Sequence, residues 1–288
     1  MKKKVLVIGG TGMLGKPVVQ ELINFGHEVT IFSTNAIEAS KLFPKLKVIE
    51  GNIKNIESIS KAFIGQDAVY INLSIPINAK PTDWNPEKDG LKNILNAAKW
   101  QSIKQIGYLS PLIRNYSENG KAWWYLKEKK SAVEMIKNSG VPHFIFSASN
   151  FMENFLSSMR RGNAINTIGS PKINNHYISG NDYGKQVAKA FSLDPQSKEF
   201  IIQGTQAINP KQAVKLFTEN YSKEKLKPGS APMGLMKFIG LFNTQIGNVA
   251  KLMTALNESP EQFKAQESWE LLGKPTTTIK EFAKSLNQ

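Results

Sequence analysis

Four glycines near the start of the chain have the spacing of a phosphate-binding turn. The stretch Val5–Leu22 reads VLVIGGTGMLGKPVVQEL, in which a short apolar run gives way to glycines and then to the apolar period of a helix. Glycine allows a tight turn, and its missing Cβ lets a pyrophosphate approach the backbone. The free N–H groups at the start of the following helix attract negative charge. The pattern predicts a dinucleotide cradle built by Gly9, Gly10, Gly12 and Gly15.

The elements that must hold this turn alternate through the first half of the chain. Short apolar runs predict strands at Lys4–Ile8, Glu28–Phe32, Lys47–Glu50, Ala68–Leu73, Gln105–Leu109 and His143–Ala148. Amphipathic runs between them predict helices at Leu14–Phe25, Ile37–Leu42, Ile56–Phe63, Lys88–Trp100 and Ala122–Ser139. This alternation predicts an α/β fold, a Rossmann-like doubly wound parallel sheet covered by helices on both faces.

In the second half of the chain, predicted strands and helices alternate less regularly. We expect residues 1–150 to form the Rossmann-like domain, with return elements near 177–205, and residues 151–288 to form a smaller α+β substrate lobe that is not an independent domain. Met233–Leu256 is apolar and predicts a helix interrupted by glycines. It could be a lid, a dimer face or a membrane-surface helix, and we expect a lid or part of the core. Further helices are expected at Asn181–Phe191, Pro210–Glu219 and Thr276–Leu286, and a strand at Phe200–Gln203.

The composition excludes several classes of protein. The 288 residues include no cysteine, which excludes a disulfide scaffold, a thiolate nucleophile and a Cys-ligated metal. No window approaches the length of a membrane span, and the first apolar run is too short for a signal peptide, so we expect a cytoplasmic protein. The net charge of +14 comes from lysines spread along the chain, which indicates solvated faces and an anionic ligand rather than nucleic acid. The three histidines are scattered and predict no metal site.

Several stretches resemble the atypical short-chain dehydrogenase/reductase superfamily and its NmrA-like branch. The glycine turn GGTGMLG is similar to the superfamily pattern T-G-x-x-G, and SGVPHFIFSASNFMENF closely resembles a segment of the NmrA-like branch. ISGNDYGKQVAKAF and FIIQGTQAINPKQAVKLF resemble later elements of that branch. The resemblance covers nearly the whole chain except about residues 222–268. It implies a Rossmann-like domain that binds NAD(P) and a smaller C-terminal lobe.

The resemblance also assigns cofactor contacts. The branch usually carries an Arg after the second strand for the 2′-phosphate of NADP, where this chain has Ser33, Thr34 and Asn35. Because this segment has no Asp or Glu that would hold a ribose 2′-hydroxyl, we expect NADP, with NAD as the other possibility. Asn52 stands where the family commonly has an Asp beside the adenine. The expected cofactor set is Gly9, Thr11, Gly12, Met13, Leu14, Gly15, Ser33, Thr34, Asn35, Asn52, Ile53, Leu73, Ser74, Lys129, Asn150 and Phe151.

The superfamily's chemistry implies a Tyr and a Lys four residues apart on one helix. Tyr125 and Lys129 have this spacing, which places them side by side. The Lys ammonium would lower the pKa of the Tyr hydroxyl and hold the nicotinamide ribose. The Tyr could then pass a proton to or from a carbonyl oxygen. Ser110, at the end of the expected fifth strand, would orient the substrate.

Other interpretations of these segments stay open. The aromatic run at 123–125 could pack on the core instead, and Lys130 with Glu134 offers a competing register. The loop Ile75–Glu87 could cover the nicotinamide or be an ordinary surface loop. Helical spacing could place three apolar side chains either in a substrate pocket or in the core, namely Met152, Phe155 and Met159.

These expectations combine into a predicted function. We expect an NADPH-dependent reductase of a small apolar carbonyl or quinone. The alternative is a non-catalytic NmrA-like sensor that holds NAD(P) and acts through a protein partner, and a weaker alternative is a sugar-nucleotide epimerase or dehydratase. The sequence names neither the substrate nor the oligomeric state.

Overall fold

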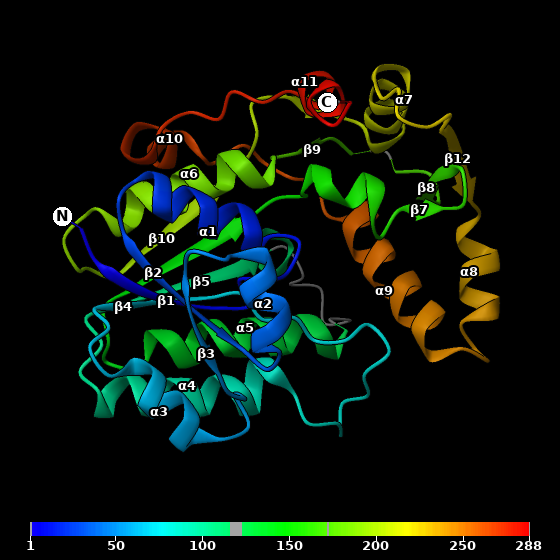
Figure 1. Cartoon of the computed structure of the whole chain (residues 1–288). Helices are drawn as coiled ribbons and strands as arrows, with labels where there is room; N and C mark the ends of the chain where they lie inside the picture. Colours follow the sequence, from blue (N-terminus) through cyan, green and yellow to red (C-terminus); the bar gives the residue numbers. More distant parts are fainter. Residues whose placement is uncertain (1, 116–122, 172, 288) are drawn as a thin grey trace.

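The computed structural model describes residues 2–115, 123–171 and 173–287. Its centre is a seven-stranded parallel sheet in the order β10-β6-β5-β4-β1-β2-β3 (Figure 1). The order runs outward in both directions from β1 and β4, which confirms the predicted doubly wound α/β fold. The strands are β1 (Lys4–Ile8), β2 (Glu28–Ser33), β3 (Lys47–Glu50), β4 (Ala68–Ile71), β5 (Gln105–Pro111), β6 (His143–Ala148) and β10 (Lys198–Ile202).

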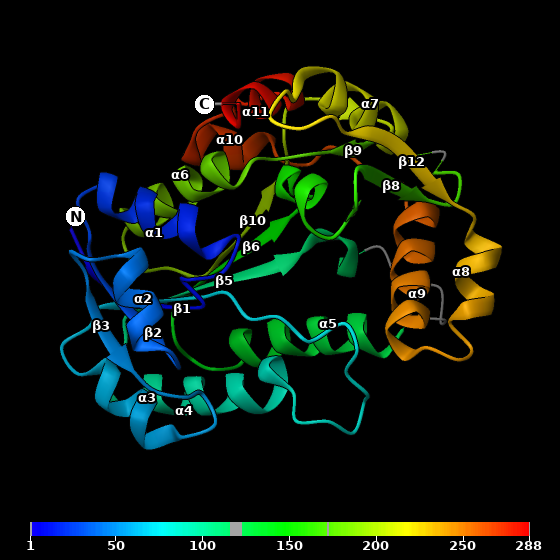
Figure 2. The ribbon, with the colours of Figure 1, turned by 45° about the vertical axis from the view of Figure 1, so that its right-hand side comes forward.

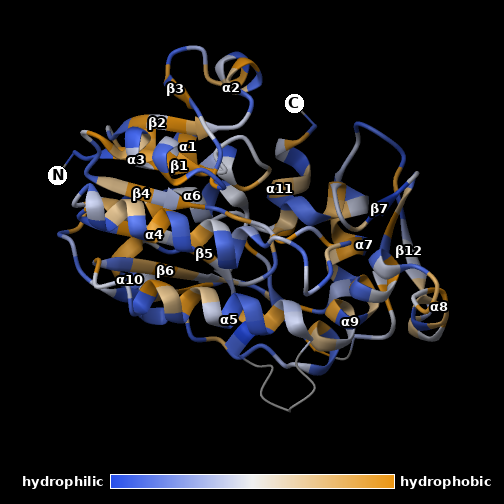
Figure 3. Cartoon of the chain, turned by 90° about the horizontal axis from the view of Figure 1, so that it is seen from below, coloured by the Kyte–Doolittle hydropathy of each residue, from blue (hydrophilic) through white to orange (hydrophobic). Residues whose placement is uncertain are grey.

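Helices cover both faces of this sheet (Figure 2). One face packs against α1 (Gly15–Asn24) and α6 (Gly180–Phe191), and the other packs against α3 (Ile56–Phe63), α4 (Leu91–Trp100) and α5 (Trp124–Lys137). Strands such as β4 are buried along their whole length, because both faces are covered. Figure 3 shows hydrophobic residues gathered on these strands.

Most of the remaining elements form a smaller lobe beyond one end of the sheet, whereas α10 (Gln266–Leu272) packs beside α6 and β10 (Figure 1). Its strands form a three-stranded sheet in the order β12-β8-β7 and a two-stranded pair of β9 with β11. A third apolar cluster includes residues of α7 and α11. Among the described residues, no helix is both long and apolar enough to cross a membrane. The bounds are β7 (Arg160–Arg161), β8 (Ala164–Ile168), β9 (Asn175–His176), β11 (Ala207–Ile208), α7 (Pro210–Asn220), β12 (Lys227–Ala231), α8 (Met233–Ile239), α9 (Thr244–Glu258), α10 (Gln266–Leu272) and α11 (Ile279–Ser285).

Some predicted elements have different bounds in the structure. The fifth strand continues to Pro111, so Ser110 lies inside it. The helix expected from Lys88 begins with the π-helical turn Pro86–Gly90 and continues as α4. The single helix expected over Met233–Leu256 is two helices, α8 and α9. Ala122, the expected start of the fifth helix, lies outside the described residues.

Candidate functional site

The glycine turn lies between the end of β1 and the start of α1. Gly9 has a φ of +82°, and a Cβ there would overlap the backbone carbonyl oxygen of Asn72, just after β4. A Cβ on Gly15 would overlap the carbonyl oxygen of Gly9. Backbone atoms fill both spaces, so both positions require glycine. Gly12 is different, because a Cβ there would meet only the Gly9 oxygen, at 3.4 Å, and would otherwise enter open space.

The start of α1 suits an anion. Leu14, at the N-cap position, makes no side-chain capping hydrogen bond, and the first turn contains no acidic residue. The first turn of α1 therefore supplies no carboxylate of its own to compensate the positive end of the helix dipole. Together with the open space at Gly12, this arrangement fits the pyrophosphate of a dinucleotide.

The end of β2 carries the residues expected at a 2′-phosphate. The Asn35 side chain caps the short helix α2 (Ala36–Leu42) by accepting the Glu38 N–H at 3.0 Å. Its Nδ2 donates to the Glu38 carboxylate at 3.4 Å, so Asn35 is engaged in the cap. The Ser33 hydroxyl accepts the Asn35 N–H at 3.1 Å, and Thr34 lies between them. Glu38 is a carboxylate that the sequence analysis missed, although an acidic residue three positions after a capping Asn is a recognisable pattern.

Asn52 and Ile53 follow β3. The Asn52 side-chain oxygen accepts the Lys54 N–H at 2.9 Å, which leaves the donors of its amide group for a neighbouring base. Ile53 packs against Gly90, where an added Cβ would lie 2.7 Å from the Ile53 Cδ1 atom. Ile53 thus lies against the turn that precedes α4.

Tyr125 and Lys129 lie one turn apart on α5. The Lys129 ammonium is 5.6 Å from the centre of the Tyr125 ring. The same ring stacks on Trp123, with ring centres 4.7 Å apart and planes inclined by 10°. Tyr125 therefore takes part in aromatic packing and also lies beside the lysine. Lys130, of the competing register, is exposed to solvent.

A buried carboxylate that the sequence analysis did not single out holds Lys129. Glu87 is 0% exposed and forms an ion pair with the Lys129 ammonium through Oε1. Its Oε2 accepts the Tyr108 hydroxyl of β5 at 2.8 Å. The Asn85 side chain caps this turn by accepting the Glu87 N–H at 2.9 Å. The run Asn-Pro-Glu was the available signal, because it combines a cap, a first-turn proline and an acidic residue.

These contacts set the proton affinities of the site. Burial raises the pKa of the Tyr125 hydroxyl, and this effect outweighs the nearby Lys129 charge, which lowers it. Burial alone would lower the pKa of Lys129, but the Glu87 carboxylate outweighs it and the pKa of Lys129 is raised. Lys129 is therefore charged and Tyr125 is protonated at neutral pH.

Two serines lie around this group. Ser74 follows β4 directly after the partly buried Leu73, and its nearby side chain lowers the pKa of the Tyr125 hydroxyl slightly, against the effect of burial. Ser110 is buried in β5, on the same face as Tyr108 two residues earlier. Its hydroxyl has no hydrogen-bond partner among the described residues. Buried polar groups are normally paired, so this hydroxyl keeps an unused hydrogen bond, although Ser110 is 0% exposed in the structure.

The other expected residues lie in the lobe and its junction with the sheet. Asn150 accepts the Ile178 N–H through its carbonyl oxygen at 3.0 Å. Phe151 is buried and packs edge-on against Tyr183, with ring centres 5.3 Å apart. The apolar side chains at helical spacing pack in or against the third core cluster, namely Met152, Phe155 and Met159.

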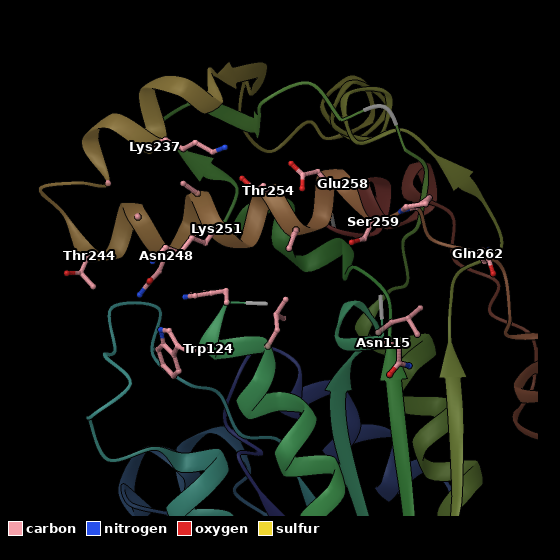
Figure 4. A pocket seen from close by; sticks show the side chains of 18 of the residues that line it. Asn115, Trp124, Lys237, Thr244, Asn248, Lys251, Thr254, Glu258, Ser259 and Gln262 are labelled. Atoms are coloured by element: carbon pink, nitrogen blue, oxygen red, sulfur yellow. The ribbon is translucent and has the colours of Figure 1, made fainter. Parts of the chain in front are cut away.

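A cavity of about 1310 Å³ opens between α5 and α9 (Figure 4). Trp123 and Trp124 form its wall on the α5 side, and Lys251 lies on the α9 side. Lys237 of α8 and Leu241 also line it. The cavity joins aromatic and aliphatic surface to a few charged groups, as small-molecule sites do.

The sequence matches a known family model over almost its whole length. The model of the NmrA-like family matches residues 1–283. The chain belongs to the NmrA-like family. A relative of this NmrA-like chain, the photosystem II assembly factor Ycf39 of Synechocystis sp., is 24% identical over 253 residues, which are 83% of this chain and 74% of that protein.

Solved structures share the fold of this NmrA-like protein. The NADPH-dependent quinone oxidoreductase QOR2 of Escherichia coli, crystallised with NADPH, superposes with a TM-score of 0.76 at 20% identity, over 98% of this chain and 99% of that one. The triphenylmethane reductase of Citrobacter sp., crystallised with NADP(H), gives a TM-score of 0.73 at 17% identity, over 99% of this chain and 100% of that one. At this identity the likeness concerns the fold.

Proposed function

We propose that the protein is an NADPH-dependent reductase of a small, apolar carbonyl or quinone. The observation that carries this proposal is the position of the Tyr125 side chain. Ser74, which lowers the pKa of the Tyr125 hydroxyl, comes two residues after Asn72, whose carbonyl oxygen fills the space beside Gly9. A proton donor and a phosphate cradle thus meet at the carboxyl edge of the sheet, where open α/β folds bind their ligands.

The chain supplies three functions for such a reduction. When bound, the nicotinamide would supply the hydride. Tyr125, with its raised pKa, retains a proton at neutral pH that it can pass to the substrate oxygen as negative charge develops there. Lys129 keeps a positive charge beneath the Tyr ring, and the unpaired Ser110 hydroxyl can bond the same oxygen.

The proposed preference for NADPH rests on the residues that follow β2 and on two solved proteins that share the fold. Thr34 offers a hydroxyl group to a 2′-phosphate, and Ser33 would do so by exchanging its hydrogen bond to the Asn35 carbonyl oxygen, at 3.3 Å. Lys41 lies in the last turn of α2. Two proteins that share the fold were crystallised with NADPH or NADP(H). Glu38 opposes this preference, because its carboxylate lies at the same helix end.

A second candidate function is favoured by the state of Lys129. Its ammonium is already paired with a buried carboxylate, so it is less free to hold a ribose. A relative at 24% identity is named as an assembly factor. A non-catalytic NAD(P)-binding protein that acts through a protein partner would have both features.

The test separates binding from turnover in Tyr125→Phe. We expect this variant to bind NADPH as the unsubstituted protein does and to lose about 100-fold or more in kcat with a reducible quinone or aldehyde. Tyr221→Phe is the matched control, because it removes a hydroxyl from the lobe cluster and should leave kcat unchanged. Unchanged turnover in Tyr125→Phe would remove the proton-donor role, and binding without any turnover in the unsubstituted protein would favour the second candidate.

A further inference from the structure

Helix α8 presents apolar side chains that no part of the described chain covers. It reads MGLMKFI, so that all its residues are apolar or glycine except Lys237, yet none is buried. The turn that follows continues the pattern with Leu241 and Phe242, which are 76% and 81% exposed. Phe238 is 63% exposed and packs edge-on against Phe242. Helices of water-facing surfaces carry a polar face, and this one has a single charge.

The hairpin formed by α8 and α9 is nevertheless held firmly to the rest of the protein. The two helices meet closely at Gly240 and Gly247, where an added Cβ would come within 3 Å of the opposite backbone. Asn248 of α9 donates to the carbonyl oxygen of Ile77 at 2.8 Å, and Asn257 donates to that of Ile168 at 2.8 Å. The apolar surface is therefore a fixed feature at the edge of the molecule (Figure 3).

The charge of this segment indicates what covers it. The hairpin itself, residues 233–258, contains Lys237, Lys251 and, at the far end of α9, Glu258, and two further lysines, Lys225 and Lys227, precede it. A second copy of the chain on a twofold axis would bring these lysines toward their own equivalents, which is unfavourable. An anionic surface with an apolar interior would pair with the lysines and accept the aromatic side chains together.

We propose that the α8–α9 hairpin docks on the surface of an anionic lipid bilayer. Phe238, Leu241 and Phe242 enter the boundary between headgroups and acyl chains, and Lys237, next to Phe238 on α8, lies among the anionic headgroups. Lys237 and Leu241 also line the cavity beside α5, so docking brings the edge of that cavity to the membrane. The docking does not depend on the reductase activity.

The test is co-sedimentation of the full chain, without cofactor or substrate, with lipid vesicles. The vesicles are phosphatidylcholine alone, or phosphatidylcholine mixed with phosphatidylglycerol. We expect about tenfold or greater preference for the anionic vesicles, weakened by salt. We expect Phe238→Ser combined with Phe242→Ser to lose about tenfold or more of that binding, and Lys237→Glu to weaken it.

Two matched controls keep the result specific. Ile37→Ser combined with Ile64→Ser removes apolar side chains of similar exposure, 73% and 65%, far from the hairpin in sequence. Lys61→Glu makes the same charge change on α3. Both controls should bind anionic vesicles as the unsubstituted protein does.

Three results would overturn the proposal. The first is an absence of vesicle binding by a folded, monomeric protein, which would leave a protein partner as the occupant. The second is self-association, measured by analytical ultracentrifugation, that the double Phe variant abolishes while vesicles are not bound. The third is equal loss of binding in the hairpin variants and in the controls. None of these results bears on turnover, so the reductase proposal stands or falls separately.

Discussion

The Lys129 ammonium and the Glu87 carboxylate form an ion pair in the protein interior, with the Tyr108 hydroxyl on the second carboxylate oxygen. The pair joins α5 to the turn that precedes α4. It holds the lysine in one place and in its charged state, directly beside Tyr125. A lysine fixed in this way can support the tyrosine without first being ordered by a ligand.

The ion pair predicts strong coupling between its two members. Glu87→Gln or Lys129→Met alone should lower the free energy of unfolding by about 3–5 kcal/mol, because each leaves a buried charge without its partner. The double variant should lose clearly less than the sum of the two losses, by about 1–3 kcal/mol. Urea unfolding of the four proteins measures this coupling, and additive losses would show that the pair does not exist in solution.

The glycine turn predicts different outcomes at two of its positions. Gly9→Ala should destabilise the fold by about 3 kcal/mol or more, since it combines a positive φ with overlap of a backbone oxygen. Gly12→Ala should change stability by about 1 kcal/mol or less and weaken NADPH binding about tenfold or more, because its methyl group enters open space at the cradle. Thermal unfolding and NADPH titration give the two readouts. If Gly12→Ala binds NADPH normally, the pyrophosphate does not lie there.

The position of Glu38 beside Asn35 predicts that its substitution changes the preference between NADPH and NADH. Glu38→Gln removes a negative charge next to Asn35. It keeps the backbone N–H of residue 38, which the capping Asn35 side chain accepts. We expect NADPH to bind roughly two- to fivefold more tightly, as for an exposed charge pair, and the gain to shrink at high salt. Titration of both cofactors by energy transfer from tryptophan measures this. Weaker NADH binding with unchanged NADPH binding would instead make Glu38 a ribose contact.

The lowered pKa of Glu199 predicts that part of the free energy of unfolding depends on pH. Burial alone would raise the pKa of this carboxyl, but the Arg114 charge and the Ser147 hydrogen bond outweigh burial and lower it below the ordinary 4.5. A lowered pKa in the folded state stabilises the fold above pH 4.5, and this contribution is lost as the pH falls through the folded-state pKa.

Glu199→Gln should therefore cost about 1–3 kcal/mol at neutral pH, and the difference from the unsubstituted protein should shrink in acid. Urea unfolding across this pH range measures the difference. Glu28→Gln, at an exposed position on β2, is the control and should follow the unsubstituted protein at every pH. A cost for Glu199→Gln that is the same at all pH values would contradict the charge-based explanation.

Patterns of neighbouring residues in the sequence were enough to predict the sheet and its glycine turn. Short apolar runs give β1, β3 and β6 with their observed bounds, and β1 and β6 leave a strong pattern because they are buried parallel strands. Gly9 and Gly15 follow from backbone geometry alone. β12 could not be predicted in this way, since it reads KPGSA and is a strand only through its pairing with β8.

The centre of the candidate site could be predicted only in part. The spacing of Tyr125 and Lys129 is local to one helix, so the sequence shows it. The partner of Lys129 is 42 residues away in a turn whose path depends on the whole fold. The same holds for α8, whose apolar pattern predicts burial, because only the assembled chain shows that Leu235 and Phe238 remain exposed.

The most direct test of the proposed function is the rate of NADPH oxidation by the unsubstituted protein across a panel of quinones and aldehydes, measured beside its affinity for NADPH. We predict tight NADPH binding and turnover with at least one quinone or apolar aldehyde that is saturable in substrate. Tight NADPH binding with no turnover across the panel would contradict the reductase and leave a cofactor-binding protein that acts through a partner.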